Sequence, residues 1–291
     1  MGAFDALFVP ALDGIAYGLL LFVVAAGLTL AFGTGNLLNL AHGVLYAGGA
    51  YLAAVLGDGS WSQLALAVLA GLALGAGGGL LLSLLLAPVA DRGHLTQALL
   101  TVGIALIGAN LLVAVFGSDE LPVTVPAGLE QTVSVAGHRY PAYRLAFVGV
   151  ALALALVGWL VLAKSRLGAL VRATTDDAEM VACSGVNPRL VRGGVLAVAG
   201  ALAGLAGALG APILGPGPRV ADTVLLLSLV VVVLGGLGSV PGAFLAAIAV
   251  GQVQSLGVVL LPDWAPYLLF AALALALVFR APGLRLLAGR A

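Results

Sequence analysis

Charged residues and cysteine are both scarce in this chain of 291 residues. Only 8% of its residues are charged, its net charge is zero, and Cys183 is its single cysteine. A soluble domain carries roughly a quarter charged residues, and a nucleic-acid-binding chain carries clusters of Lys and Arg that this sequence lacks. One cysteine forms neither an intrachain disulfide nor a cysteine-cluster metal site. We therefore expect neither a soluble domain nor a nucleic-acid partner.

Residue patterns for nucleotide binding and catalysis are missing as well. Lys164 is the only lysine, and it follows Ala163 where a phosphate-binding G-x-x-x-x-G-K-[ST] loop requires glycine. His42, His94 and His138 lie far apart, with no H-E-x-x-H motif and no carboxylate pair beside them. We therefore predict that the chain is not an enzyme, uses no metal or other cofactor, and does not bind ATP by itself.

Long apolar runs dominate what is present. Hydrophobic residues make up 62% of the chain, and its mean hydropathy is +1.20. A helix needs about 20 apolar residues to cross the hydrocarbon core. The pattern predicts such segments near 11–32, 37–57, 64–87, 95–116, 145–163, 192–213, 223–240, 242–261 and 265–280. We predict an all-α fold, a polytopic membrane protein forming one domain over 1–291, with eight or nine transmembrane helices and glycine-rich breaks; 37–57 and 265–280 are the weakest spans.

The distribution of Lys and Arg predicts the orientation. The 164–192 connection holds five of them, and the tail holds Arg280, Arg285 and Arg290 without an acid. Cytoplasmic loops carry an excess of such residues, so both segments are predicted to be cytoplasmic. The N-terminus lacks the basic region of a cleaved secretory signal. We therefore expect its first segment to be retained as a span, with the N-terminus outside and the C-terminus in the cytoplasm.

Glycine is frequent along the spans. The chain has 42 glycines, and Gly71, Gly75 and Gly79 recur at helical spacing. Small residues let membrane helices approach closely, since lipid offers no hydrophobic incentive for them to associate. The glycine pattern predicts a tight bundle.

Polar residues interrupt the apolar pattern in GTGNLLNLAHGVLYAGGAYLAAVLG at 33–57. A helix that breaks at 33–35 and restarts near Asn36 would aim free backbone N–H groups at the interior, where a carboxylate could bind. We predict that Asn36, Asn39, His42 and Tyr46 line the route of a transported molecule. Three glycines are predicted to permit close helix approach: Gly43, Gly48 and Gly49. The alternative is that the polar residues satisfy backbone groups at a turn between two helices.

A second glycine-rich interruption, GGLGSVPG at 235–242, occupies a matching position in the other half of the chain and suggests an internal duplication. Pro241 suits the first turn of the following helix. Gln252 and Gln254 lie within the next span, where hydrogen bonding across helices is the simpler interpretation.

The 164–192 connection contains a predicted short helix in RATTDDAEMVACSGVNP. Asp176 is expected to be its N-cap, with Glu179 three residues later and Gly185 at its C-terminal end. Ala178, Val181 and Ala182 would share one face. So small an apolar face suggests a groove in another protein as its partner; an ordinary structured loop is the alternative.

The late spans contain no ionisable residue in their interiors, so proton coupling is not expected. Backbone carbonyls can bind sodium, which leaves sodium coupling open. Energy supplied by another subunit suits this composition better.

Four stretches resemble the branched-chain amino acid ABC transporter permeases of the LivH type. They are GLTLAFGTGNLLNLAHGVLYAGGAYLA at 27–53, LLTVGIALIG at 99–108, GALVRATTDDAEMVACSGVNPRLVR at 168–192 and VVLGGLGSVPGAFLAA at 232–247. The resemblance covers nearly the whole chain and implies a permease subunit in the cytoplasmic membrane with about eight spans. It also implies as partners two ATP-binding subunits, a homologous second permease and an extracytoplasmic substrate-binding protein.

The predicted substrate path comprises Asn36, Asn39, His42, Gly43, Tyr46, Thr101, Gly235, Gly236, Gly238 and Ser239. Residues 168–192 resemble the family's coupling loop, and the predicted ATPase-coupling residues are Arg172, Ala173, Asp176, Asp177, Glu179, Ala182, Gly185 and Asn187. The 117–144 and 215–222 connections are candidates for receiving the binding protein, or else ordinary solvated loops. An importer of urea or short amides, a sodium-coupled secondary transporter and a passive channel remain alternatives.

Overall fold

The computed structural model describes residues 3–35, 37, 39–89, 92–265, 267–268, 270–271 and 273–274. The helices, in chain order, are α1 (Ala3–Gly35), α2 (His42–Leu56), α3 (Trp61–Leu86), α4 (His94–Phe116), α5 (Ala142–Lys164), α6 (Arg166–Asp176), α7 (Ala178–Cys183), α8 (Pro188–Gly210), α9 (Val220–Gly235) and α10 (Val240–Leu260). A 3-10 turn, η1 (Ala87–Val89), and two strands, β1 (Thr132–Val135) and β2 (His138–Pro141), complete the elements in these ranges.

Each predicted span from 11–32 to 242–261 coincides with one of these helices. By length and composition, 6 helices in the described part of the chain could cross a membrane: α1, α3, α4, α5, α8 and α10. The structure confirms the all-α class, but it does not confirm eight or nine full-length spans. α2 and α9 have only 15 and 16 residues, or about 22–24 Å of helix against a hydrocarbon core of about 30 Å. Most of 265–280 lies outside the described residues, so that crossing stays a prediction.

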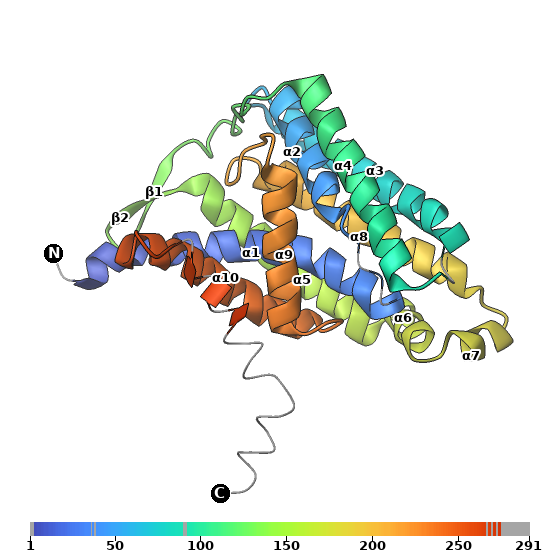
Figure 1. The fold of residues 1–291 in the computed structure, drawn as a ribbon. Coiled ribbons are helices and arrows are strands. Elements are labelled where there is room, and N and C mark those ends of the chain that lie inside the picture. The colour runs from blue at the N-terminus through green and yellow to red at the C-terminus, as the bar shows by residue number, and fades with distance from the viewer. Residues whose placement is uncertain are drawn as a thin grey trace, which may run out of the picture.

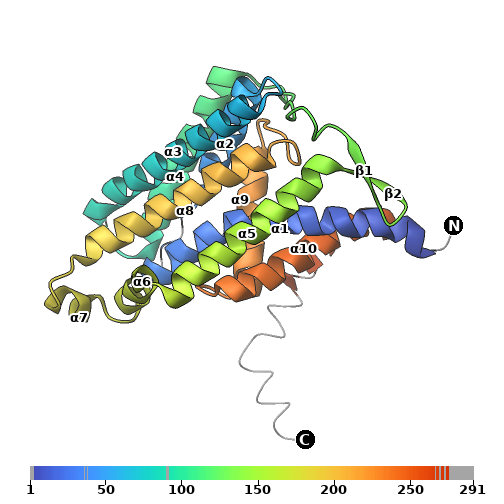
Figure 2. The ribbon, with the colours of Figure 1, turned by 180° about the vertical axis from the view of Figure 1, so that it is seen from behind.

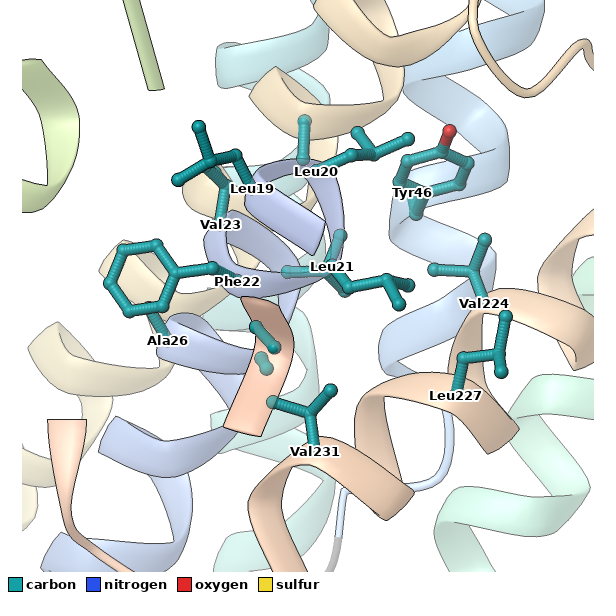
Figure 3. Packing of buried hydrophobic residues seen from close by; sticks show 14 of the residues in the cluster. Leu19, Leu20, Leu21, Phe22, Val23, Ala26, Tyr46, Val224, Leu227 and Val231 are labelled. Atoms are coloured by element: carbon teal, nitrogen blue, oxygen red, sulfur yellow. The ribbon is translucent and has the colours of Figure 1, made fainter. Parts of the chain in front are cut away.

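α1 is the central helix of the bundle. Figures 1 and 2 show it running through the middle of the molecule, with α9 and α10 on one side and α5 and α8 on the other. Its buried side chains point in several directions, and Figure 3 shows them beside residues of α2 and α9: Leu19, Leu20, Leu21, Phe22, Val23 and Ala26 with Tyr46, Val224, Leu227 and Val231. A helix that is apolar on all faces is buried by its neighbours. α1 therefore forms the core against which the other helices pack.

Glycine allows α3 and α8 to pack backbone against backbone. A β-carbon on Gly75 would lie 2.1 Å from the Gly200 carbonyl oxygen, and one on Gly79 would lie 2.1 Å from that of Leu196. Gly71 is similarly close, at 2.7 Å from another α8 carbonyl. The close approach predicted from these glycines is confirmed.

Two predictions about α10 are also confirmed. Pro241 lies in its first turn, where its missing N–H leaves no hydrogen bond unmade. The Gln252 side chain donates from Nε2 to the Ala11 carbonyl oxygen of α1 at 2.9 Å. The corresponding role of Gln254 stays a prediction.

The 117–144 connection contains a β-hairpin that sequence reasoning missed. β1 and β2 pair antiparallel from Thr132 opposite Pro141 to Val135 opposite His138. Ala136 and Gly137 form the turn, and their φ angles are 51° and 87°. The commonest two-residue hairpin turn has positive φ at both of its residues. The overlooked signal is the alternation in TVSV and HRYP around Ala-Gly.

Asp13 of α1 fastens this hairpin to the bundle. The Tyr140 hydroxyl of β2 donates to Asp13 Oδ1 at 2.9 Å, and Arg144 at the start of α5 forms an ion pair with the same carboxylate. Figures 1 and 2 show the hairpin near the N-terminus, at the end of the bundle opposite α6 and α7. These two ends are called the hairpin end and the α6–α7 end below.

The glycine contacts generate a matched pair of substitutions on α3. Gly75→Ala should destabilise the protein by about 1–3 kcal/mol, since its β-carbon would meet backbone that cannot move away. Gly77→Ala is the control, because a β-carbon there meets nothing within 4 Å. Thermal unfolding of the purified protein in detergent measures both. Equal midpoints for the two variants would contradict the packing described.

The hairpin contact generates a pH prediction. Burial, and then the hydrogen bond to Asp13, raise the pKa of the Tyr140 hydroxyl. Because the pKa is higher in the folded state, the contribution of the protonated Tyr140 hydroxyl to folding stability is fully present below the ordinary pKa of about 10. This contribution is lost as pH rises above that value. When the pH is raised from about 9 to 11, the thermal unfolding midpoint of Tyr140→Phe should therefore fall less than that of the wild type. Tyr267→Phe, at an exposed tyrosine, is the control, and identical pH profiles for all three proteins would refute the contact.

Candidate functional site

The turn between α1 and α2 buries the polar residues predicted to line the substrate path. α1 continues to Gly35 and α2 starts at His42, so the predicted restart near Asn36 is wrong by about two helical turns. Asn36 itself lies outside the described residues. Within this turn the Asn39 Oδ1 accepts from the Ala41 N–H at 3.1 Å, so a side chain bonds a backbone group that lies before the helix.

Thr101 of α4 hydrogen-bonds a backbone group of the same turn. Its hydroxyl oxygen accepts from the Leu40 N–H at 3.2 Å, and the hydroxyl donates to the Ala98 carbonyl at 2.9 Å. Thr101 and Asn39 have relative exposures of 0% and 2%. Both side chains therefore act on backbone groups in this conformation.

His42 and Tyr46 are buried one turn apart on α2. The His42 Nε2 lies 3.0 Å from the Val24 carbonyl oxygen of α1, and the Tyr46 hydroxyl donates to the Leu214 carbonyl at 3.5 Å. These are contacts of the kind that the alternative interpretation describes, in which polar residues satisfy backbone groups. The substrate-path assignment of Asn39, His42, Tyr46 and Thr101 remains a prediction.

Glycines of α2 allow close helix approach as expected. A β-carbon on Gly43 would lie 2.1 Å from the Ala221 carbonyl oxygen of α9, and one on Gly49 would lie 2.1 Å from that of Gly204 of α8. Gly48 faces only the end of the Leu74 side chain, at 2.9 Å. α2 thus meets α8 and α9 through its glycines at backbone distance, and it meets α3 through side chains.

The second glycine-rich interruption forms the connection between α9 and α10. Gly236 and Gly238 have φ of +98° and +78°, a backbone conformation that favours glycine. The Ser239 hydroxyl oxygen accepts from the Gly242 N–H at 3.2 Å and so caps α10. A β-carbon on Gly33 of α1 would lie 3.5 Å from the Gly238 Cα. The two interruptions recognised in the sequence therefore meet in space.

The predicted coupling loop contains two helices, α6 and α7, instead of one. Asp177 is the N-cap of α7, and its Oδ1 accepts from the Glu179 and Met180 N–H groups at 3.0 and 2.9 Å. The N-cap prediction for Asp176 is therefore wrong by one position, since Asp176 ends α6. Gly185 has φ of +86° after α7, which confirms its role at the C-terminal end.

The remaining coupling residues hold the two helices in place. Asn187 caps α8 by accepting from the Arg189 N–H at 2.9 Å, and the Ala173 carbonyl accepts from the Asp177 N–H at 2.9 Å. The Arg172 guanidinium donates to the Leu162 carbonyl at the end of α5. This hydrogen bond joins α6 to α5, a long apolar helix.

The apolar face expected on α7 is arranged differently. Val181 is buried, Ala178 is half-buried and Ala182 is exposed, because α7 packs against α6 and α8 of the same chain. Val181 is therefore covered by this chain and does not face a partner protein, contrary to the expectation from the sequence. Met180, which is 69% exposed, is the large apolar side chain that α7 presents outwards.

A cleft of about 640 Å³ opens at the α6–α7 end. Its walls are the last turns of α1 and α5, one side of α6, and the α9–α10 connection. It brings together residues predicted for different roles, since Arg172 and Asp176 of the coupling set line it together with Gly238 and Ser239 of the path set. The other predicted path residues in the described part of the chain do not line it.

Sequence reasoning missed Thr29 and Trp159, which also line this cleft. The available signal was weak: Thr29 is the one polar residue in the apolar run GLTLAF at 27–32, and Trp159 lies near the end of a predicted span. Neither position follows a motif, because the cleft is formed by segments that are far apart in the chain.

The observed N-cap of α7 can be tested directly. Asp177→Ala should destabilise α7 by about 1 kcal/mol through loss of two hydrogen bonds, whereas Asp176→Ala should leave this helix unchanged. Hydrogen exchange of the amides of residues 178–183 measures the difference. Equal loss of protection in both variants would contradict the assignment.

Comparison with known proteins identifies the family. Residues 11–280 match the family described as branched-chain amino acid transport system / permease component. The chain is 26% identical over 286 residues to the high-affinity branched-chain amino acid transport system permease protein BraD of Pseudomonas aeruginosa, covering 94% of this chain and 93% of that one. It is 29% identical over 253 residues to the probable branched-chain amino acid transport permease protein LivH of Methanocaldococcus jannaschii, covering 83% and 78%. No solved structure matches the chain. With most of its length matched and its apolar helices suggesting a multi-pass membrane protein, the chain belongs to the family of branched-chain amino acid transport system permease components.

Proposed function

We propose that this chain is the transmembrane permease subunit of an ATP-powered ABC importer for branched-chain or similar small amino acids. The family match over residues 11–280 is the observation that carries the proposal. The importer would lie in the cell membrane and comprise this chain, a homologous second permease and two ATP-binding subunits. An extracytoplasmic substrate-binding protein would deliver the amino acid.

The distribution of Lys and Arg supports an orientation of the bundle in the membrane. α6, α7 and their flanking residues carry Lys164, Arg166, Arg172, Arg189 and Arg192, so the α6–α7 end is proposed to be cytoplasmic. The hairpin end would then be extracytoplasmic and would meet the binding protein. In this orientation the N-terminus is outside, and the tail with Arg280, Arg285 and Arg290 is in the cytoplasm.

Energy for transport is proposed to enter through α6 and α7. After their first five residues, α8, α9 and α10 contain no ionisable residue, and this composition gives a coupled proton no site deep within those helices. α7 presents exposed Met180 beside exposed Asp177 and Glu179, a small mixed surface suited to a groove in an ATP-binding subunit. α6 lines the cleft, so a movement of α7 can change the shape of the cleft.

The substrate would cross at the interface with the second permease. Gly235, Gly236, Gly238 and Ser239, at and after the end of α9, would belong to the cytoplasmic end of this route. The support is that Gly238 and Ser239 line the cleft. Asn36, Asn39, His42, Gly43, Tyr46 and Thr101 would belong to it in a conformation that exposes them.

Reconstitution of the complete importer tests the function. Proteoliposomes containing both permeases, the ATP-binding subunits and the loaded binding protein should accumulate L-leucine only with ATP. Accumulation by the isolated chain without ATP would overturn the proposal in favour of a secondary transporter or channel.

The exposed side chain of α7 provides a specific variant. Met180→Glu places a charge on the proposed contact surface and should lower ATP-dependent uptake roughly tenfold or more, the usual effect of losing an interface anchor. Met180→Leu, which keeps an apolar side chain of similar size at the same position, should leave ATP-dependent uptake intact. Normal uptake by a correctly inserted Met180→Glu importer would argue against docking through α7.

A further inference from the structure

The floor of the cleft contains a buried hydroxyl without a partner. Thr29 lines the cleft at 1% relative exposure, and its Oγ1 has no hydrogen-bond partner among the residues that the structure describes. Other hydroxyls on the cleft are occupied: Thr175 donates to the Val171 carbonyl at 2.9 Å, and Ser239 accepts from the Gly242 N–H. Buried polar groups are nearly always hydrogen-bonded in folded proteins. Thr29 therefore marks a place where a polar group from outside the chain can bind.

The N-terminus of α10 opens onto the same cleft. Ser239, Val240 and Pro241 line it at the first turn of this 21-residue helix. Pro241 has no N–H and the Gly242 N–H is bonded to Ser239 Oγ, which leaves the Val240 N–H, at the positive end of the helix dipole, to attract a carboxylate. Charged side chains at the cleft are one cation and one anion, Arg172 and Asp176. This balance suits a zwitterion better than an ion of either sign.

A separate apolar cavity adjoins the cleft at α5 and α10. This cavity of about 340 Å³ shares Trp159, Val240 and Pro241 with the cleft and is otherwise lined by apolar residues such as Phe22 and Phe244. A small ligand with one polar end and one aliphatic end would find both environments within a few residues. The 640 Å³ of the cleft is within the range of small-molecule sites, about 300–1,000 Å³.

We propose that this cleft is the site from which a small aliphatic amino acid leaves the transporter, with Thr29 as a binding residue and the N-terminus of α10 as its carboxylate contact. The inference rests on the proposed function and deepens it, because it places substrate between α1, α5, α6 and α10 instead of at α2. The Thr29 hydroxyl would bond a polar group of the amino acid, and the aliphatic side chain would lie toward Phe22 and Phe244.

Thiol labelling of the complete importer tests the site without relying on transport. Leu237, which lines the cleft and is 64% exposed, is replaced by cysteine in a Cys183→Ser background, and a thiol reagent is added from the α6–α7 side. L-leucine at about ten times its Kd should slow labelling of Leu237→Cys roughly tenfold, by mass action. Leu95→Cys, 75% exposed at the start of α4 and outside the cleft, should label at the same rate with and without leucine.

A second substitution identifies the role of the hydroxyl. Adding Thr29→Val, which keeps the volume, should raise the leucine concentration needed for protection by roughly 2- to 10-fold, the effect of one lost hydrogen bond. Ser228→Ala is the matched control, since its buried hydroxyl bonds the Val224 carbonyl of its own helix and does not line the cleft. Absence of protection by leucine, or protection unchanged by Thr29→Val, would overturn the site.

The two proposals fail in different ways. Protection of the cysteine by leucine needs no ATP. If leucine protects but the wild-type importer shows no ATP-dependent uptake, the proposed function is overturned and the leucine site is kept. ATP-dependent uptake without protection would overturn the site alone. Absence of both would overturn both.

Discussion

Contact between helix backbones at glycine determines how this bundle is built. Lipid is as apolar as the side chains that face it, so helices in a membrane gain little by burying oily surface against one another. In this chain, β-carbons on Gly43, Gly49 and Gly75 would lie 2.1 Å from backbone oxygens of neighbouring helices. The gain from such packing comes from many van der Waals contacts at close range. α2, α3 and α8 can be held in this way only while these positions remain glycine.

This packing also decides where open space is left. With α2 pressed between α8 and α9, polar residues at its N-terminal end are buried and bond backbone groups. The large cleft lies instead at the α6–α7 end. Its walls come from α1, α5, α6 and the α9–α10 connection, so α6 belongs to both the coupling loop and the cleft. Under the proposed function, ATPase movement and substrate release would be linked through this one helix.

The sequence predicted the features that depend on local pattern. Eight apolar segments gave eight helices, because each run is long enough to be recognised without knowledge of its neighbours. Gly75 and Gly79 predicted close packing, Gln252 a contact across helices, and Pro241 the start of α10. The helical ends were less predictable: Asp176 and Asp177 are adjacent acids, and which one caps α7 depends on how α6 ends. The hairpin was missed because its two strands have only four residues each.

The candidate site was less predictable than the fold. Thr29, Trp159, Asp176 and Ser239 are distant in sequence and meet only because α1, α5, α6 and α10 converge at one end. His42 and Asn39 stood out in the sequence as polar residues in an apolar segment. In the structure they bond the Val24 carbonyl and the Ala41 N–H, and a sequence pattern alone does not distinguish a backbone-bonding role from a ligand-binding one.

The central claim is that α6 transmits the action of the ATP-binding subunits to the cleft. Spin labels at Thr175 of α6 and Leu237 of the α9–α10 connection, in a Cys183→Ser background, would report the width of the cleft by electron–electron distance measurement in the complete importer. The account predicts that the distance distribution shifts between the nucleotide-free and ATP-bound states. The same distribution in both states, in an importer that transports normally, would contradict it.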